Sequence, residues 1–200
     1  MTVLSSTPPV NSNEWEFRWA PYDLPTYQLV LNQLLSNDVI LEIGAGDLRL
    51  ARQMSALTRK VYAIEINPSV LEEGIASFAP LPGNLIPICA DARLHDFPRG
   101  VTSGVLLMRH CTHFRLYAEK LRDCGCSRLI TNARWRMSVE VVDLQAARIP
   151  FKDMELGWYA CWCGTVGFKP GAAEQISPET QKIIYEVIDC PNCKRNNFLI

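Results

Sequence analysis

Three acidic residues recur at the ends of apolar segments, and a glycine turn follows the first of them. Glu42 lies in VILEIGAG, Glu65 in YAIEIN and Asp91 in PICADA. Each apolar segment has the composition of a strand buried on both faces. Because the carboxyl ends of parallel strands meet at one edge of a sheet, we expect the three carboxylates to line a common ligand site there.

The glycine turn restricts which ligand this site can hold. Gly44 and Gly46 lack a Cβ, so the backbone can turn sharply and approach a ligand closely. A dinucleotide fingerprint needs a third glycine where the chain has Arg49, which excludes a pyrophosphate-binding turn. Acceptors at three strand ends suit a ligand with an ammonium, a ribose diol and an adenine amino group. S-adenosylmethionine has all three, and its positive sulfur favours acidic surroundings.

The elements that position these residues follow from the hydrophobic pattern. Apolar segments predict strands over 39–44, 60–66, 84–90, 104–110 and 128–133. Helical spacing predicts helices over 47–57, 67–78 and 112–124, the second with Asn67 as N-cap and Pro68 in its first turn. This order implies an α/β, Rossmann-like doubly wound and mainly parallel sheet. The aromatic segments beyond residue 150 predict antiparallel C-terminal strands and a small zinc-bound β element.

Together, VILEIGAGDLRLA, KVYAIEINPSVLE and NLIPICADA resemble class I S-adenosylmethionine-dependent methyltransferases over residues 38–135. The resemblance implies contacts to the methionine part of the cofactor from Glu42, Gly44, Ala45 and Gly46, to the ribose from Glu65, and to the adenine from Ile66, Asp91 and Ala92. Leu48 departs from the family, since many members have glycine there. GAGDLR also resembles the GxGDGR variant of small prokaryotic members and of some protein-lysine methyltransferases, as PYDLPTY resembles their preceding segment.

The expected reaction site is the end of the fourth strand, MRHCTHF. The Asn/Asp-Pro-Pro-aromatic motif of enzymes that methylate base amines is absent. His110 and His113 are the candidate proton acceptors, and a helix cap or a structural hydrogen bond is the alternative for either. Cys111 as a cytosine-directed nucleophile lacks the expected preceding proline.

The methyl acceptor stays open between RNA, a protein side chain and a small molecule. Trp135 stands between Arg134 and Arg136, an arrangement that can grip a nucleotide. Acidic residues interleave with the arginines of this region, so an ordinary solvated face is the alternative. A non-catalytic Rossmann-like binding module, using a zinc ribbon to contact protein or RNA, is the alternative function.

Two cysteine pairs predict a structural zinc site. Cys190 and Cys193 frame the CPNC half-site, whose tight turn directs two thiolates at one metal, and Cys161 and Cys163 form the second pair. All four sulfurs meet if the flanking segments pair as antiparallel strands, with Gly164 allowing the turn. A redox-active C-x-x-C is disfavoured because the polar KRNN that follows does not predict a helix.

Composition limits the remaining classes. The chain has 200 residues with 20 basic and 21 acidic side chains, so no overall charge attracts it to nucleic acid or anionic membrane. Neither a membrane span nor a signal peptide is evident, so we expect a cytoplasmic protein. Its eight cysteines are then not expected to form structural disulfides. We expect a flexible tail over 1–13, a methyltransferase domain over 14–150 and C-terminal strands with the zinc ribbon over 151–200.

Overall fold

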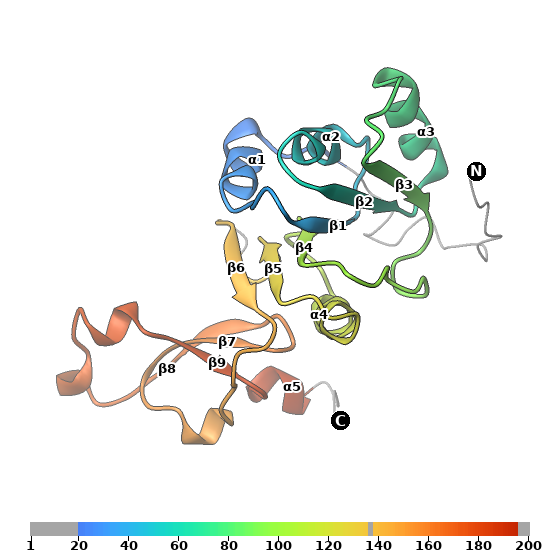
Figure 1. Cartoon of the computed structure of the whole chain (residues 1–200). Coiled ribbons are helices and arrows are strands. Elements are labelled where there is room, and N and C mark those ends of the chain that lie inside the picture. Colours follow the sequence, from blue (N-terminus) through green and yellow to red (C-terminus); the bar gives the residue numbers. More distant parts are fainter. Residues whose placement is uncertain (1–19, 136–137, 196–200) are drawn as a thin grey trace. The chain divides into compact units, whose positions relative to one another are not determined.

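The computed structural model describes residues 20–135 and 138–195 (Figure 1). The predicted tail over 1–13 and the side chain of Arg136 lie outside the described residues. The chain divides into two compact units. The N-terminal unit contains the chain as far as Cys111 together with Leu116–Leu144, and the C-terminal unit contains Thr112–Arg115 and the chain from Gln145 onward.

A six-stranded sheet forms the centre of the N-terminal unit, in the order β3-β2-β1-β4-β5-β6. Its strands are β1 Val39–Ile43, β2 Lys60–Glu65, β3 Leu85–Cys89, β4 Ser103–Leu106, β5 Arg128–Thr131 and β6 Glu140–Asp143. The first five are parallel and β6 is antiparallel to β5. The strand order reverses between β1 and β4, where doubly wound sheets bind their ligands. The predicted Rossmann-like, mainly parallel fold is thus confirmed.

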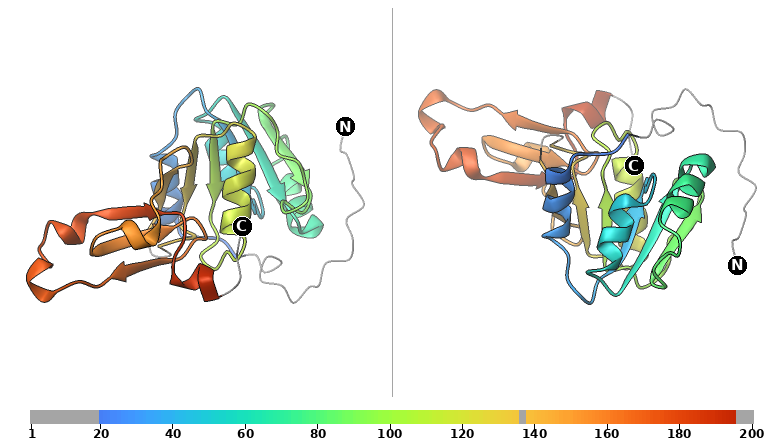
Figure 2. Two further views of the ribbon diagram at one scale, coloured as in Figure 1. Left: turned by 90° about the horizontal axis from the view of Figure 1, so that it is seen from below. Right: turned by 90° about the horizontal axis from the view of Figure 1, so that it is seen from above.

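Helices cover both faces of this sheet (Figures 1 and 2). They are α1 Leu24–Leu31, α2 Arg49–Ser55, α3 Pro68–Ser77 and α4 Phe114–Asp123. The first three lie on one face and α4 lies on the other. A core cluster joins α1, α2 and α3 to the sheet through side chains such as Val30, Met54 and Leu71, together with Ile40 and Val105 of the strands. Burial on both faces explains the nearly continuous apolar strands.

The sequence correctly predicts the start of α3 but not the end of the fourth strand. Asn67 caps α3 as predicted, since its Oδ1 accepts from the amides of Ser69 (3.1 Å) and Val70 (3.4 Å). The fourth strand, predicted over 104–110, ends earlier at Leu106. The following residues form a turn in which the Cys111 amide donates to the Met108 carbonyl (3.0 Å). The predicted histidine segment is therefore a loop and does not extend the sheet.

A second sheet forms the C-terminal unit, in the order β8-β7-β9. Its elements are β7 Gly157–Cys161, β8 Val166–Lys169, β9 Ile184–Val187, the helix α5 Pro191–Arg195, and the 3-10 turns η2 Phe151–Asp153, η3 Ala173–Gln175 and η4 Thr180–Lys182. The predicted antiparallel pairing holds for β7 and β8. In contrast, β7, which ends at Cys161, and β9, which precedes Cys190, are parallel.

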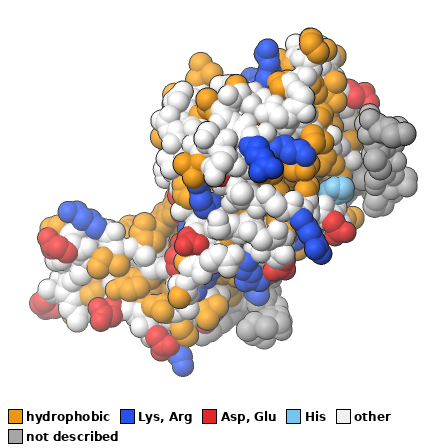
Figure 3. Space-filling model, in the orientation of Figure 1, with side chains coloured by type: hydrophobic (Ala, Val, Ile, Leu, Met, Phe, Trp, Pro, Cys, Tyr) orange, Lys and Arg blue, Asp and Glu red, His pale blue; other side chains and the backbone are white. Residues whose placement is uncertain are grey.

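The described surface is chemically mixed. Figure 3 shows basic, acidic and apolar side chains scattered over the face in view. The large apolar side chains exposed in the C-terminal unit include Trp158, Ile176, Ile183, Ile184 and Ile188. Of the helices in the described residues, none combines the length and the apolar character that crossing a membrane requires.

Candidate cofactor and metal sites

The turn after β1 uses left-handed backbone at three positions. Gly44 has φ 76°, Gly46 has φ 56° and Leu48 has φ 65°. Glycine adopts such angles freely, whereas a leucine there is strained by about 1–2 kcal/mol. Leu48 is completely buried in the core, so its packing offsets the strain. The one departure from the family pattern therefore stands where the backbone itself favours glycine.

Glu65 ties this turn to the end of β2. Its Oε2 accepts from the Gly46 amide and its Oε1 from the Asn67 amide, both at 2.8 Å. Burial raises the pKa of Glu65, and the amide hydrogen bonds oppose that rise. A carboxylate has about four lone-pair positions, so capacity beyond these amide hydrogen bonds remains for a ligand hydroxyl.

Glu42 lies at the end of β1 and is only 5 % exposed. Its Oε2 is buried and has no hydrogen-bond partner within the described part of the chain. Burial, followed by the charges of Glu65 and Asp47, raises the pKa of Glu42 well above its usual range. A buried carboxyl group without a partner is costly, and a bound cation would remove that cost.

Asp91, immediately beyond β3, is held by its neighbour Arg93. The Arg93 fork donates to both Asp91 oxygens, with Nε at 3.0 Å from each and Nη2 at 2.8 Å from Oδ2. On the other side of this loop, the Lys120 ammonium of α4 donates to three backbone oxygens, those of Ala92 (2.8 Å), Arg93 (3.0 Å) and His95 (2.8 Å). The loop after β3 therefore has a fixed position although no helix follows it.

A hollow opens at the carboxyl ends of β1, β2, β3 and β4. It is lined by Ile43, Gly44, Ile64, Ile66, Ala90, Asp91, Ala92, Arg93, Met108 and Tyr117. Of the predicted cofactor residues, it brings together Gly44, Ile66, Asp91 and Ala92. Glu42, Ala45, Gly46 and Glu65 do not line it, although the hydrogen bonds described above connect two of them to the same turn.

Sequence reasoning missed Gly74, a glycine inside α3 that lets the helix approach the cofactor turn. A Cβ at this position would overlap the backbone of Asp47. The signal available was an isolated glycine in an otherwise helical pattern, which often marks a close packing contact. Arg93, Met108 and Tyr117 were missed as lining residues, because nothing in their local sequence marks them.

The two predicted proton acceptors lie in different units. His110 is exposed and belongs to the N-terminal unit, two residues beyond Met108 of the hollow. His113 belongs to the C-terminal unit, and its Nδ1 is 3.2 Å from the Thr112 hydroxyl. The structure therefore relates only His110 to the hollow.

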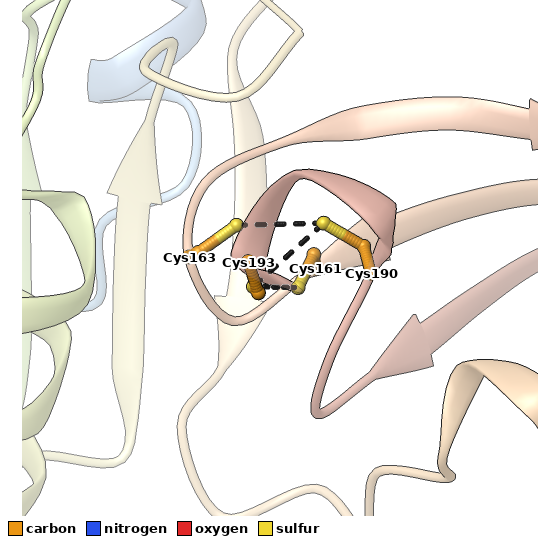
Figure 4. Close-up of side chains that lie close together, drawn as sticks. All are labelled: Cys161, Cys163, Cys190 and Cys193. Carbon is orange, nitrogen blue, oxygen red and sulfur yellow. Dashed lines mark hydrogen bonds between the residues drawn. The ribbon is translucent and has the colours of Figure 1, made fainter. Parts of the chain in front are cut away.

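The four predicted cysteines converge in the C-terminal unit (Figure 4). Sulfur–sulfur distances are 3.6 Å for Cys161–Cys193, 3.8 Å for Cys163–Cys190 and 3.7 Å for Cys190–Cys193. A tetrahedral ion with metal–sulfur bonds of about 2.3 Å requires sulfurs about 3.8 Å apart. The cluster thus has the dimensions and the ligand types of a four-cysteine metal site, although β7 and β9 are parallel.

The surroundings of the cysteines correct one prediction and agree with another. CPNC opens the short helix α5, so the expectation that no helix follows it is wrong. A redox pair needs only its own two thiols, whereas here four sulfurs share one centre. Gly164 has φ 91°, as the turn after Cys163 requires, and a Cβ on it would lie 3.0 Å from the Phe114 Cβ. The metal turn therefore packs directly on Phe114.

Comparison with known proteins identifies similar structures but no relatives by sequence. No family model and no curated protein matches the chain. Similar solved structures include a precorrin 8W decarboxylase from Methanobacterium thermoautotrophicum, with 21 % identity, a TM-score of 0.48 and coverage of 56 % of this chain and 63 % of that one. A dimethyladenosine transferase from Plasmodium falciparum has 19 % identity, a TM-score of 0.48 and coverage of 55 % and 41 %.

The 23S rRNA methyltransferase ErmE is also similar, with 18 % identity, a TM-score of 0.49 and coverage of 55 % of this chain and 46 % of that one. In all three comparisons the match spans less than two thirds of the other chain. Methyltransferases are thus among the similar structures, as the sequence resemblance implies. The likeness is one of fold, and the activity is a separate question.

Proposed function

We propose that the protein is an S-adenosylmethionine-dependent methyltransferase. The observation that carries the proposal is the buried Oε2 of Glu42, which lacks a partner among the described residues and ends the strand that leads into the left-handed glycine turn. A positively charged group is the partner that such an oxygen requires. The donor set beyond it fits the rest of the cofactor.

In this proposal each predicted residue has one role. Glu42 binds the ammonium of the methionine part, and the turn Gly44–Ala45–Gly46 lets the backbone approach it. The free lone pairs of Glu65 accept from the ribose hydroxyls. Ile66 packs on the adenine, while Asp91 and Ala92 receive its amino group. Arg93 keeps the Asp91 carboxylate in position.

When bound, the cofactor supplies a methyl group whose bond to sulfur breaks, with its electron pair, as the acceptor's lone pair bonds to the carbon. The chain's contribution is orientation of the acceptor and exclusion of water from the hollow. His110, beside Met108, takes the acceptor's proton. His113 remains the second candidate for that role.

Calorimetric titration with S-adenosylmethionine and S-adenosylhomocysteine tests the proposal. We expect micromolar binding of both, and binding at least about tenfold weaker for Glu42→Gln, which removes the charge but keeps the shape. NADH and ATP serve as control ligands, since the turn lacks the third glycine of a pyrophosphate site. Equal binding of NADH, or no binding of either sulfur nucleoside, contradicts the proposal.

We also propose that Cys161, Cys163, Cys190 and Cys193 hold one structural zinc ion. Four thiolates complete a tetrahedral shell and leave no open position, so the ion supplies stability and takes no part in the reaction. The support is the set of three sulfur–sulfur distances between 3.6 and 3.8 Å and the burial of Cys161, Cys190 and Cys193.

A further inference from the structure

Buried polar atoms without partners occur at the ends of three neighbouring strands in the described part of the N-terminal unit. Within its described residues these atoms are Glu42 Oε2, Arg109 Nε, and both Oδ1 and Nδ2 of Asn132. Glu42 ends β1, Arg109 follows β4 and Asn132 follows β5, and these three strands are neighbours in the sheet. Folded proteins rarely leave several such groups unpaired at one edge, so the edge is built for a ligand.

Asn132 is the least expected member of this set. It is 1 % exposed, and its amide has neither donor nor acceptor contacts in the described chain. Its neighbours along the chain do have partners. The Thr131 hydroxyl donates to the Leu106 carbonyl (2.7 Å) and accepts from the Ala133 amide (3.0 Å), and Arg134 pairs with Glu140 at 2.7 Å. Asn132 thus differs from the flanking residues, whose polar groups make these contacts.

Arg109 adds a cation whose position is fixed by aromatic contacts. Its guanidinium lies 5.0 Å from the ring centroid of Tyr22, and its backbone amide donates to the Tyr22 hydroxyl (3.2 Å). The exposed Asp23 also interacts with this charge. A guanidinium with a buried Nε–H presents the side-on pair of donors that binds an oxyanion.

We propose that Asn132 and Arg109 bind the methyl acceptor, which carries an oxyanion, phosphate or carboxylate, next to a neutral hydroxyl or amino group. The inference rests on the proposed function, which assigns Glu42 to the cofactor. The Nε–H of Arg109 and the Asn132 amide N–H pair with the oxyanion. The Asn132 oxygen can only accept, so the acceptor must bring an N–H or O–H of its own. Because Asn132 is 1 % exposed, the residues around it must shift when the acceptor binds.

Binding of the two oxyanions is tested by NMR on the whole protein saturated with S-adenosylhomocysteine. The signals are the Nε–H of Arg109 and the side-chain amide of Asn132, with the buried Nε–H of Arg148 as an internal control. Phosphate and acetate are titrated at constant ionic strength against chloride. We expect one oxyanion to move the Arg109 and Asn132 signals and leave Arg148 unchanged, and the effective ion identifies a phosphate- or a carboxylate-bearing acceptor.

The same titration separates failure of this inference from failure of the proposed function. If S-adenosylhomocysteine binds but neither oxyanion moves the two signals more than chloride does, the acceptor assignment is wrong and the cofactor assignment stands. If S-adenosylhomocysteine does not bind, the proposed function fails first. Arg109→Met is expected to weaken oxyanion binding at least about tenfold with unchanged affinity for S-adenosylhomocysteine.

Stability provides a test that needs no ligand. Because the Asn132 amide is desolvated and unpaired, Asn132→Leu removes a penalty and should raise the melting temperature by about 2–4 °C. The matched control is Asn84→Leu, since the Asn84 amide donates to the Ser55 carbonyl (2.8 Å) and the Thr58 carbonyl (3.1 Å), and its loss should lower the melting temperature. A melting temperature lowered by Asn132→Leu and by Asn132→Ala alike would assign Asn132 a structural role and overturn the proposal.

Discussion

Different interactions stabilise the interior of each unit. In the N-terminal unit, helices on both faces bury a sheet whose core is almost entirely aliphatic. In the C-terminal unit, a three-stranded sheet has a small core cluster in which three of the six fully buried members are cysteines, namely Cys161, Cys190 and Cys193. One unit is stable through apolar packing, and in our proposal the other is stabilised by the zinc ion that its sulfurs hold.

The difference shows where each unit can tolerate unpaired polar groups. The large aliphatic core of the N-terminal unit supplies enough stability for Glu42, Arg109 and Asn132 to remain without partners at the sheet edge in the described chain. The small core of the C-terminal unit has no comparable reserve, because domains of this size commonly need a metal or disulfides. Both ligands should stabilise the folded state, but only loss of the metal should unfold its unit.

The largest expected effect is loss of the metal. Structural zinc sites of this kind contribute about 10 kcal/mol or more, so chelation or Cys190→Ala should unfold the C-terminal unit. Hydrogen exchange is expected to accelerate in β7 and β9 while β1 and β4 remain protected. Cys126→Ala, at a buried cysteine outside the cluster, is the control and should keep one equivalent of zinc. Less than about half an equivalent of zinc in metal-replete wild-type protein would refute the site.

The next effect is confined to the aliphatic unit. In Gly74→Ala the added methyl overlaps the backbone of Asp47, which cannot withdraw as a flexible side chain could. Overpacking of this kind costs about 1–3 kcal/mol and should move the turn, so both unfolding stability and cofactor affinity should fall. Gly83→Ala is the control, because a Cβ there meets no atom within 4 Å. Equal denaturation midpoints for the two variants would show that α3 does not constrain the turn.

Glu42→Gln should stabilise the empty protein while weakening cofactor binding. Folding raises the pKa of Glu42 above 4.5, so the folded state binds more protons than the unfolded state, and stability falls as pH rises from 4.5 toward the folded-state pKa. The Glu42→Gln variant has no ionisable group at this position, so its stability does not fall in this way as pH rises. Its advantage in unfolding free energy should grow with pH to about 1–2 kcal/mol at pH 8, measured by urea denaturation.

Glu65→Gln is the contrasting variant, because its carboxylate accepts two backbone amides that a carboxamide cannot both satisfy. It should be destabilised at the same pH. A change of stability in the same direction for both glutamine variants would contradict the prediction that the unpartnered carboxyl of Glu42 destabilises the fold while the hydrogen-bonded carboxylate of Glu65 stabilises it.

The smallest expected effect is a reversal, at position 48, of the usual order in which an alanine variant is more stable than a glycine variant. Leu48→Ala and Leu48→Gly both lose the buried side chain, but only alanine keeps the strain of φ 65°. The glycine variant should therefore be the more stable of the two by about 1 kcal/mol in urea denaturation. At Ala51, within α2, alanine should instead exceed glycine by about the same amount. A more stable alanine variant at position 48 would mean that the turn relaxes.

The sequence predicts the sheet well because its signals are local. Apolar segments locate the parallel strands, and Asn67 with Pro68 locates the start of α3. Local patterns cannot locate contacts made by distant residues, such as Gly74 on Asp47. The helix α5 was missed because its polar composition gives no apolar periodicity. The role of Asn132 could not be predicted from the sequence either, because an asparagine becomes unusual only when the fold buries it and supplies no hydrogen-bond partner.

Lys120 has a consequence for chemical modification. Its ammonium is the only group shown to hold three carbonyl oxygens of the loop after β3 within the described residues, and burial lowers its pKa. An acetyl group on this nitrogen would remove the charge and two of its three hydrogens at once. The segment that carries Asp91 and Ala92 would then lose hydrogen bonds to α4. Acylation of Lys120, on the opposite face of the sheet from α2, should therefore loosen the part of the hollow that these two residues line.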